Sequence, residues 1–199
     1  MPLAPQADVE AQIAPYASRL VAIVEGAWQA WRDAGHGYWR ANRSRANFVW
    51  EEMVERAHQA FNGDPRVHIV GRNETFYFVL DQSVVFRFKK GDPSDLTCNI
   101  PTQTSLAFHD PQCELEGIGD TTRVDVLYVL NPLETAVVDV RVVARDGDRV
   151  AWRLSLMAPA PVVPMPMPMA MAEPQAPQAP ARRSLVQAPA AGDTRRKQP

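Results

Sequence analysis

The sequence predicts an α+β domain in which two N-terminal amphipathic helices pack on an antiparallel sheet of about five strands. Three observations carry this prediction: apolar residues recur at helical spacing over residues 15–61, and they alternate with polar ones over residues 76–88 and again over residues 124–156. Helical spacing lines up apolar side chains on one face of a helix, whereas a period of two places them on one face of a strand. Residues 1–157 are therefore expected to form a single α+β domain.

The first predicted helix spans residues 15–34. Pro15 suits the first helical position, where its missing N–H costs no hydrogen bond, and Gly35 ends the helix. The second predicted helix spans residues 45–61, and Asn62-Gly63 supplies a left-handed cap at its C-terminus. Two such helices joined by a short connection are expected to pack as a hairpin against the sheet.

The first predicted strand pair is a hairpin with the three-residue turn Asp81-Gln82-Ser83. This turn places Phe78 opposite Phe86 and Leu80 opposite Val84, with all four apolar side chains on one face. A two-residue turn would move one strand's apolar set to the wrong face, because the side-chain period of a strand is two.

The same parity argument sets the registers of the last three strands. Pairing Leu130 with Ala136 gives a five-residue loop between the first two of them. Pairing Ala144 with Val150 gives an odd-numbered loop around residues 146–148, in place of the two-residue Asp146-Gly147 turn that its composition favours.

These registers align Asp125, Arg141 and Arg153 across the outer face of the sheet. Such a cross-strand ladder of charges is typical of a solvated face. The longest connection of the domain, residues 91–121, is polar and is predicted to contain a short helix at 101–108. Long connections often carry function, so this segment is a candidate contact surface.

Residues 158–199 are predicted to be a disordered tail. They hold ten of the eighteen prolines and no aromatic residue, too little apolar surface to offset the entropy of ordering the chain. The sign of the net charge changes at the same point. Residues 1–157 carry 16 basic and 21 acidic residues, and the tail carries five basic and two acidic residues. An acidic domain argues against a dedicated nucleic-acid-binding protein, whose expected footprint is a basic surface.

The sequence also favours a bacterial, cytoplasmic protein. Arg outnumbers Lys by 18 to 3, which is associated with GC-rich bacterial genomes. The N-terminus lacks the features of a signal peptide, and no apolar run is long enough to cross a membrane. The two cysteines, Cys98 and Cys113, are expected to be thiols.

The motifs of catalytic and metal sites are incomplete. His109 and Cys113, with Cys98 upstream, lack the paired short spacings of a structural zinc site. No metal and no cofactor are therefore predicted.

A nuclease-like arrangement is incomplete as well. Asp81 followed by Arg87-Phe88-Lys89 is similar to the acidic motif of one large nuclease class, but Arg87 occupies the place of the second acid. Only Glu74 could replace that metal ligand, and metal-assisted hydrolysis needs converging carboxylates.

The partner-binding residues predicted from the sequence lie at three places. Trp39, in the Gly-containing helix connection, is expected to be an exposed aromatic anchor for a protein partner. Arg87, Lys89 and Lys90 form a basic cluster on one strand. The long connection contributes Asn99, Thr102 and Gln103, which can offer hydrogen-bond donors and acceptors to a partner.

Four segments together resemble a group of small uncharacterised bacterial proteins encoded beside helix-turn-helix/zinc-metallopeptidase regulators. These segments are residues 73–75, 87–90, 99–103 and 128–131, and the resemblance extends over residues 15–156. It implies a companion protein of a regulatory, toxin–antitoxin or phage-defence pair. The metallopeptidase's own His-Glu-x-x-His motif is absent, so the resemblance implies the partner and not the protease.

The function predicted from the sequence is that of a non-enzymatic bacterial protein-interaction or regulatory partner, with a protein as its ligand and no contact with membranes. The first alternative is a nucleic-acid-binding protein that uses Arg87, Lys89, Lys90 and the basic tail. The second alternative is a metal-dependent hydrolase.

Overall fold

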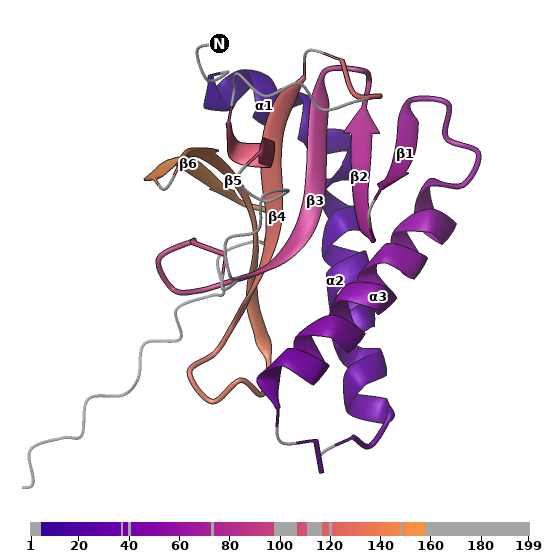
Figure 1. The fold of residues 1–199 in the computed structure, drawn as a ribbon, viewed down its shortest axis with the longest axis vertical. Coiled ribbons are helices and arrows are strands. Elements are labelled where there is room, and N and C mark those ends of the chain that lie inside the picture. Colours follow the sequence, from indigo (N-terminus) through magenta and orange to yellow (C-terminus); the bar gives the residue numbers. More distant parts are fainter. Residues whose placement is uncertain are drawn as a thin grey trace, which may run out of the picture. The chain divides into compact units, whose positions relative to one another are not determined.

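The computed structural model describes residues 5–36, 38–39, 41–72, 74–97, 107–110, 117–119, 121–147 and 149–157. Helices at the N-terminus pack on one face of a six-stranded sheet (Figure 1). The α+β class predicted from the sequence is confirmed. The sheet has six strands instead of about five, and it is mixed instead of purely antiparallel. The predicted tail, residues 158–199, lies outside the described residues.

The helical layer contains one more helix than predicted. Its elements are α1 (Gln6–Ile13), the 3-10 turn η1 (Ala14–Tyr16), α2 (Ala17–Asp33) and α3 (Asn42–Phe61). The two longer helices correspond to those predicted from the apolar spacing, and Pro15 lies within η1. The additional helix, α1, buries only Val9 and Ile13, so its apolar pattern is too short to stand out in the sequence.

The sheet is built from six strands in chain order. These are β1 (Val67–Arg72), β2 (Thr75–Leu80), β3 (Val84–Gly91), β4 (Thr122–Leu130), β5 (Val137–Asp146) and β6 (Arg149–Ser155). All neighbouring strands are antiparallel except β3 and β4, which are parallel. A parallel pair requires a crossover connection, and residues 92–121, here called the crossover segment, supply it.

The hairpin register predicted for β2 and β3 is confirmed. Phe78 lies opposite Phe86, and Leu80 lies opposite Val84. The turn between them holds Asp81 and Gln82 at positive φ, so two consecutive residues reverse the chain.

The registers predicted for the last three strands are wrong by about two residues. Leu130 pairs with Val137 instead of Ala136, and a bulge follows at Val129/Leu130. In the β5–β6 pair, Ala144 lies opposite Trp152, and a second bulge at Ala144/Arg145 precedes a two-residue turn. Each bulge changes the parity as the predicted loop length would, so most apolar residues still face the core. Val138 is the exception: the alternation predicted it on the core face with Val140 and Val142, but it lies at the bulge and is 52% exposed, and Val137 packs against the core instead.

The main core lies between the helices and the sheet. Leu20, Val24 and Met53 of the helices pack against the buried aromatic side chains Phe86 and Phe88 of β3. A second, smaller apolar cluster lies on the opposite face, here called the outer face, where Phe108 and Ile118 of the crossover segment cover Tyr77, Val79 and Val85.

Candidate functional site

A buried ionic cluster lies on the outer face beneath the crossover segment. Nε of Arg87 donates to Oδ1 of Asp125 at 2.8 Å, and Nη2 of Arg87 lies 2.9 Å from Nε2 of His109. The guanidinium carbon lies 4.0 Å from the ring centre of Phe108, at cation–π distance. Arg87 is only 2% exposed. It therefore holds the crossover segment on the sheet and does not face a ligand.

The protonation state of Asp125 follows from these neighbours. Complete burial by itself would raise the pKa of Asp125, but the charge of Arg87 and the contact with His109 hold that pKa below its ordinary value. Asp125 is thus an ionised carboxylate inside the domain, at 3.2 Å from Nε2 of His109.

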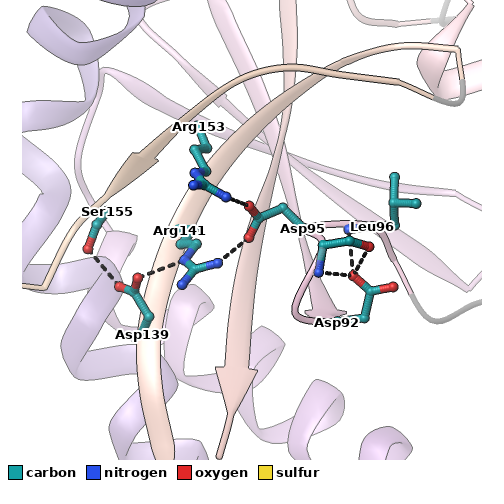
Figure 2. Close-up of polar contacts among 8 residues, drawn as sticks. Asp92, Asp95, Leu96, Asp139, Arg141, Arg153 and Ser155 are labelled. Carbon is teal, nitrogen blue, oxygen red and sulfur yellow. Dashed lines mark hydrogen bonds and ion pairs between the residues drawn. The ribbon is translucent and has the colours of Figure 1, made fainter.

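A second buried carboxylate, Asp95, joins the crossover segment to the last two strands. Figure 2 shows its two oxygens directed at Arg141 of β5 and Arg153 of β6, the latter at 2.7 Å. Asp139 accepts from Nε of Arg141 at 2.7 Å, and this hydrogen bond, followed by the contact with Asp95, raises the pKa of Arg141 despite its partial burial. Nearby, Asp92 accepts from the Leu96 N–H at 3.0 Å and closes the loop.

These contacts correct the prediction of a solvated charge ladder. Asp125 lies opposite Val143 and not Arg141, and both Asp125 and Asp95 are fully buried. The carboxylates of the outer face are therefore buried and fasten the crossover segment, whereas Arg153, which pairs with Asp95, keeps 63% of its side chain exposed.

A pocket of about 660 Å³ lies at the edge of the sheet, between the first half of α3 and the ends of β2 and β3. Trp50, Met53, Phe76 and Tyr128 supply its apolar and aromatic walls. The rings of Trp50 and Phe76 lie 6.1 Å apart, so one aromatic side chain comes from the helix and the other from the strand. Polar side chains line the pocket as well, and these are Asn47, Glu51, Glu74, Thr75, Lys89 and Lys90. Apolar walls with several polar groups are a common form of ligand site.

Two of the predicted partner-binding residues, Lys89 and Lys90, line this pocket. Nζ of Lys90 donates to Oε1 of Glu134 at 2.6 Å, and Arg45 binds the other oxygen of that carboxylate. The hydrogen bond from Lys90, and then that from Arg45, hold the pKa of Glu134 below its ordinary value. Lys90 is thus already paired with an acid.

Lys89 differs from Lys90. Among the described residues no hydrogen bond or ion pair is made by its ammonium group. Burial, and secondly the charge of Arg87, lower the pKa of Lys89, with Asp125 opposing the shift. A half-buried cation without a close acidic partner is a group that an anionic ligand can satisfy.

The pocket lies where β2 separates from β3. The paired residues of these strands end at Phe78 and Phe86, yet β3 continues to Gly91 and β2 begins at Thr75. In Figure 1 the lower half of β3 continues past the short β1–β2 hairpin, with α3 beside it. Over Arg87–Lys90, β3 is paired with β4 on one side and has no partner in β2 on the other, and at Gly91 this second side is bridged by Thr97.

Trp39 lies apart from this pocket, in the connection between α2 and α3. It is 38% exposed and stacks on His36, with 4.2 Å between the ring centres. The prediction that Trp39 is an exposed aromatic residue agrees with this placement.

The other candidates have different outcomes. Several lie outside the described residues: Asn99, Thr102, Gln103, Cys98 and Cys113. Within the described part of the chain, no three His, Cys, Asp or Glu side chains gather into a group that could hold a metal ion. The residues of the nuclease-like arrangement are separated in the fold. Asp81 and Glu74 lie in different turns, and Arg87 pairs with Asp125.

Sequence reasoning missed the buried ionic cluster, although β4 carries a signal for it. Leu127 and Val129 are apolar and share the face of Asp125, while Val126 and Tyr128 are apolar on the other face. A strand that is apolar on both faces is typical of one covered on both sides. This pattern indicates that Asp125 lies beneath another segment.

Within the described residues, no helix combines the length and the apolar character that crossing a membrane requires. Comparison of the chain with protein-family models, with curated proteins and with solved structures found no match.

Proposed function

We propose that this protein is a non-enzymatic interaction partner that binds an extended segment of another protein as an additional strand along Arg87–Lys90 of β3. The observation that carries the proposal is the early separation of β2 from β3. An edge that lacks a neighbouring strand can accept one, because its backbone N–H and C=O groups can pair with an incoming chain.

The pocket supports the same mode of binding. Side chains of an added strand would point alternately to the two faces of the sheet, and those on the helix side would enter the space in front of Trp50 and Phe76. Lys89 adds a cation at the edge. The partner segment is therefore expected to combine apolar side chains with an acidic one.

The resemblance described above supplies a first partner to test. It implies a companion protein in a regulatory, toxin–antitoxin or phage-defence pair, so the protein encoded beside this one is the natural candidate. Binding through an exposed strand edge is compatible with such a pair, since β-strand addition joins folded domains to extended segments.

The alternative of nucleic-acid binding through the β3 cluster receives less support. Arg87 is buried against Asp125, and Lys90 is paired with Glu134. Of the three predicted phosphate contacts on this strand, only Lys89 is without such a pairing among the described residues.

The test is a selection of peptides from a library of random sequences on the purified protein, followed by affinity measurement and hydrogen exchange. We expect the selected peptides to carry apolar residues and an acid, and to slow amide exchange at Arg87–Lys90. Lys89→Glu should weaken binding at least about tenfold, since it replaces an attraction by a repulsion, whereas Lys89→Arg should retain it.

Tyr38→Ala is the matched control, because Tyr38 is exposed and does not line the pocket. Its affinity for the selected peptides should equal that of the unchanged protein. The proposal is wrong if no peptide is selected, or if the peptides bind without slowing exchange at Arg87–Lys90. In that case Lys89 and Lys90 merely protect a strand edge from self-association.

A further inference from the structure

A cluster of aromatic side chains lies in the connection between α2 and α3. His36 is at its centre: it stacks on Trp39 with an interplanar angle of 5°, and its ring centre lies 5.7 Å from Trp31 and 5.6 Å from Phe48. Tyr38 is perpendicular to Trp39 and is 73% exposed. The cluster thus has a packed base, formed by Trp31 and Phe48, and an exposed upper part.

The surrounding sequence is strongly basic. Residues 32–45 contain four arginines and one acidic residue, within a domain that is acidic overall. Arg32 and Arg43 are exposed, and neither makes an ion pair with an acidic side chain in the described part of the chain. Asp33, the one acid of this stretch, accepts a hydrogen bond from Gln29 at 2.7 Å. Arg45 is paired with Glu134, so the positive charge that remains without an acidic partner among the described residues is that of Arg32 and Arg43.

We propose that this corner, formed by His36, Tyr38, Trp39, Arg32 and Arg43, is a binding site for single-stranded nucleic acid. The exposed rings offer platforms on which unpaired bases stack, and the arginines offer charges for the phosphates. This combination of exposed aromatic rings and unneutralised cations is the one that single strands require, and it lies on a different surface from the strand edge of β3.

The charges select the class of ligand. A protein hot spot uses aromatic anchors as well, but uncompensated arginines beside them favour a polyanion. The acidic remainder of the domain opposes a duplex, which would bring a wide double row of phosphates to the surface. A single strand can contact the corner alone.

The experiment uses the full-length protein and a fluorescein-labelled oligo(dT) of about 12 nucleotides, with binding measured by fluorescence anisotropy over a range of salt concentrations. Tyr38→Ala should weaken binding roughly five- to a hundredfold, the usual effect of removing one stacking residue. Arg43→Gln should reduce the slope of log affinity against log salt by about 0.7, because one phosphate contact is lost.

The control is Arg149→Gln on β6, an exposed position outside this corner and outside the pocket, which removes the same charge as Arg43→Gln and should leave oligo(dT) affinity unchanged. Both Tyr38 and Arg43 are exposed, so their replacement preserves the fold. The proposal is overturned if oligo(dT) fails to bind at low salt, if both variants bind as tightly as the unchanged protein, or if duplex DNA competes as well as the single strand does. Failure here leaves the peptide-binding proposal intact, since the two sites share no residue.

Discussion

Asp125 and Arg87 form the ion pair that is most deeply buried among the described residues, with side-chain exposures of 0% and 3%. Burying two charges is costly, and their attraction compensates for that cost only while both are present. The pair therefore contributes little net stability compared with apolar residues of similar size, yet its disruption is severe. Its role is to hold the crossover segment through Phe108 and His109.

Asp125→Asn should lower the free energy of unfolding by about 3–5 kcal/mol, because it leaves the charge of Arg87 buried without a partner. Urea unfolding followed by circular dichroism measures this loss. The double variant Arg87→Met/Asp125→Leu should recover most of it, since no charge is then left buried.

Glu52→Gln provides the comparison for that series. It removes the surface ion pair between Glu52 and Arg56 on α3, and the side chains of both residues are partly exposed. The expected loss is only about 0.3–0.5 kcal/mol. A similar loss for Asp125→Asn would mean that the buried pair is solvated in solution.

At the scale of elements, α1 shows how tertiary contacts stabilise a helix that its own sequence barely specifies. It has eight residues and no side-chain cap at its N-terminus. Isolated helices of this length are unstable in water. The side chains of Val9 and Ile13, which are almost completely buried, attach it to the core.

Ile13→Ala should lower the free energy of unfolding by about 2–5 kcal/mol, the usual cost of removing a large apolar side chain from a core. The measurement is again urea unfolding. Glu10→Ala, on the exposed side of the same helix, should change it by less than about 0.5 kcal/mol. Equal, small effects of both substitutions would show that α1 is detached from the core.

The strand registers show the limit of parity arguments. Two bulges, at Val129/Leu130 and at Ala144/Arg145, each insert one residue into a ladder. A bulge changes parity just as a longer loop does, so the sequence pattern alone does not distinguish them. The assignment of side chains to faces was correct for most residues because it depends on parity, but it was wrong for Val138, which lies at a bulge and is exposed. The residue pairs depend on where the extra residue lies.

For the whole molecule, acid is expected to be destabilising. The carboxyl groups of Asp64, Asp92, Asp125 and Glu134 have pKa values below their ordinary ones in the folded state. Near pH 4 the unfolded chain therefore binds protons that the folded chain does not. The stabilisation is complete above the unfolded pKa values and is lost as the pH falls through the lowered folded ones.

We expect the free energy of unfolding to be nearly constant between about pH 5 and 7 and to fall steeply below about pH 4. Urea unfolding at a series of pH values measures this. Asp125→Asn should make the fall shallower, because one of the groups that resists protonation is removed. An unchanged slope in that variant would contradict an ionised Asp125 in the folded state.

Deletion of residues 158–199 should leave the Tm nearly unchanged. Their composition, with ten prolines and no aromatic residue, predicts no contribution to a hydrophobic core. Thermal unfolding of the full chain and of residues 1–157 provides the comparison. A fall of several degrees in the shortened chain would show that the tail packs on the domain.

The sequence by itself determined the α+β class, the two long helices, the β2–β3 hairpin and the face to which most of the alternating apolar side chains point. These features depend on local periodicity and on turns such as Asp81-Gln82-Ser83, which are read from neighbouring residues. It did not reveal the strand Val67–Arg72, which lies at the edge of the sheet and is only partly buried.

Only the tertiary structure decided which polar residues are buried and where the sheet is open. Arg87 and Lys89 lie on the same strand. Arg87 is enclosed by Asp125 and Phe108, whereas Lys89 lines a pocket where β2 separates from β3. The burial of Arg87 and the position of Lys89 at the pocket depend on contacts between residues that are distant in the chain. The apolar pattern of β4 indicates that both of its faces are covered, but it does not say which segment covers Asp125 or where β2 leaves β3. These contacts arise only when the layers pack together.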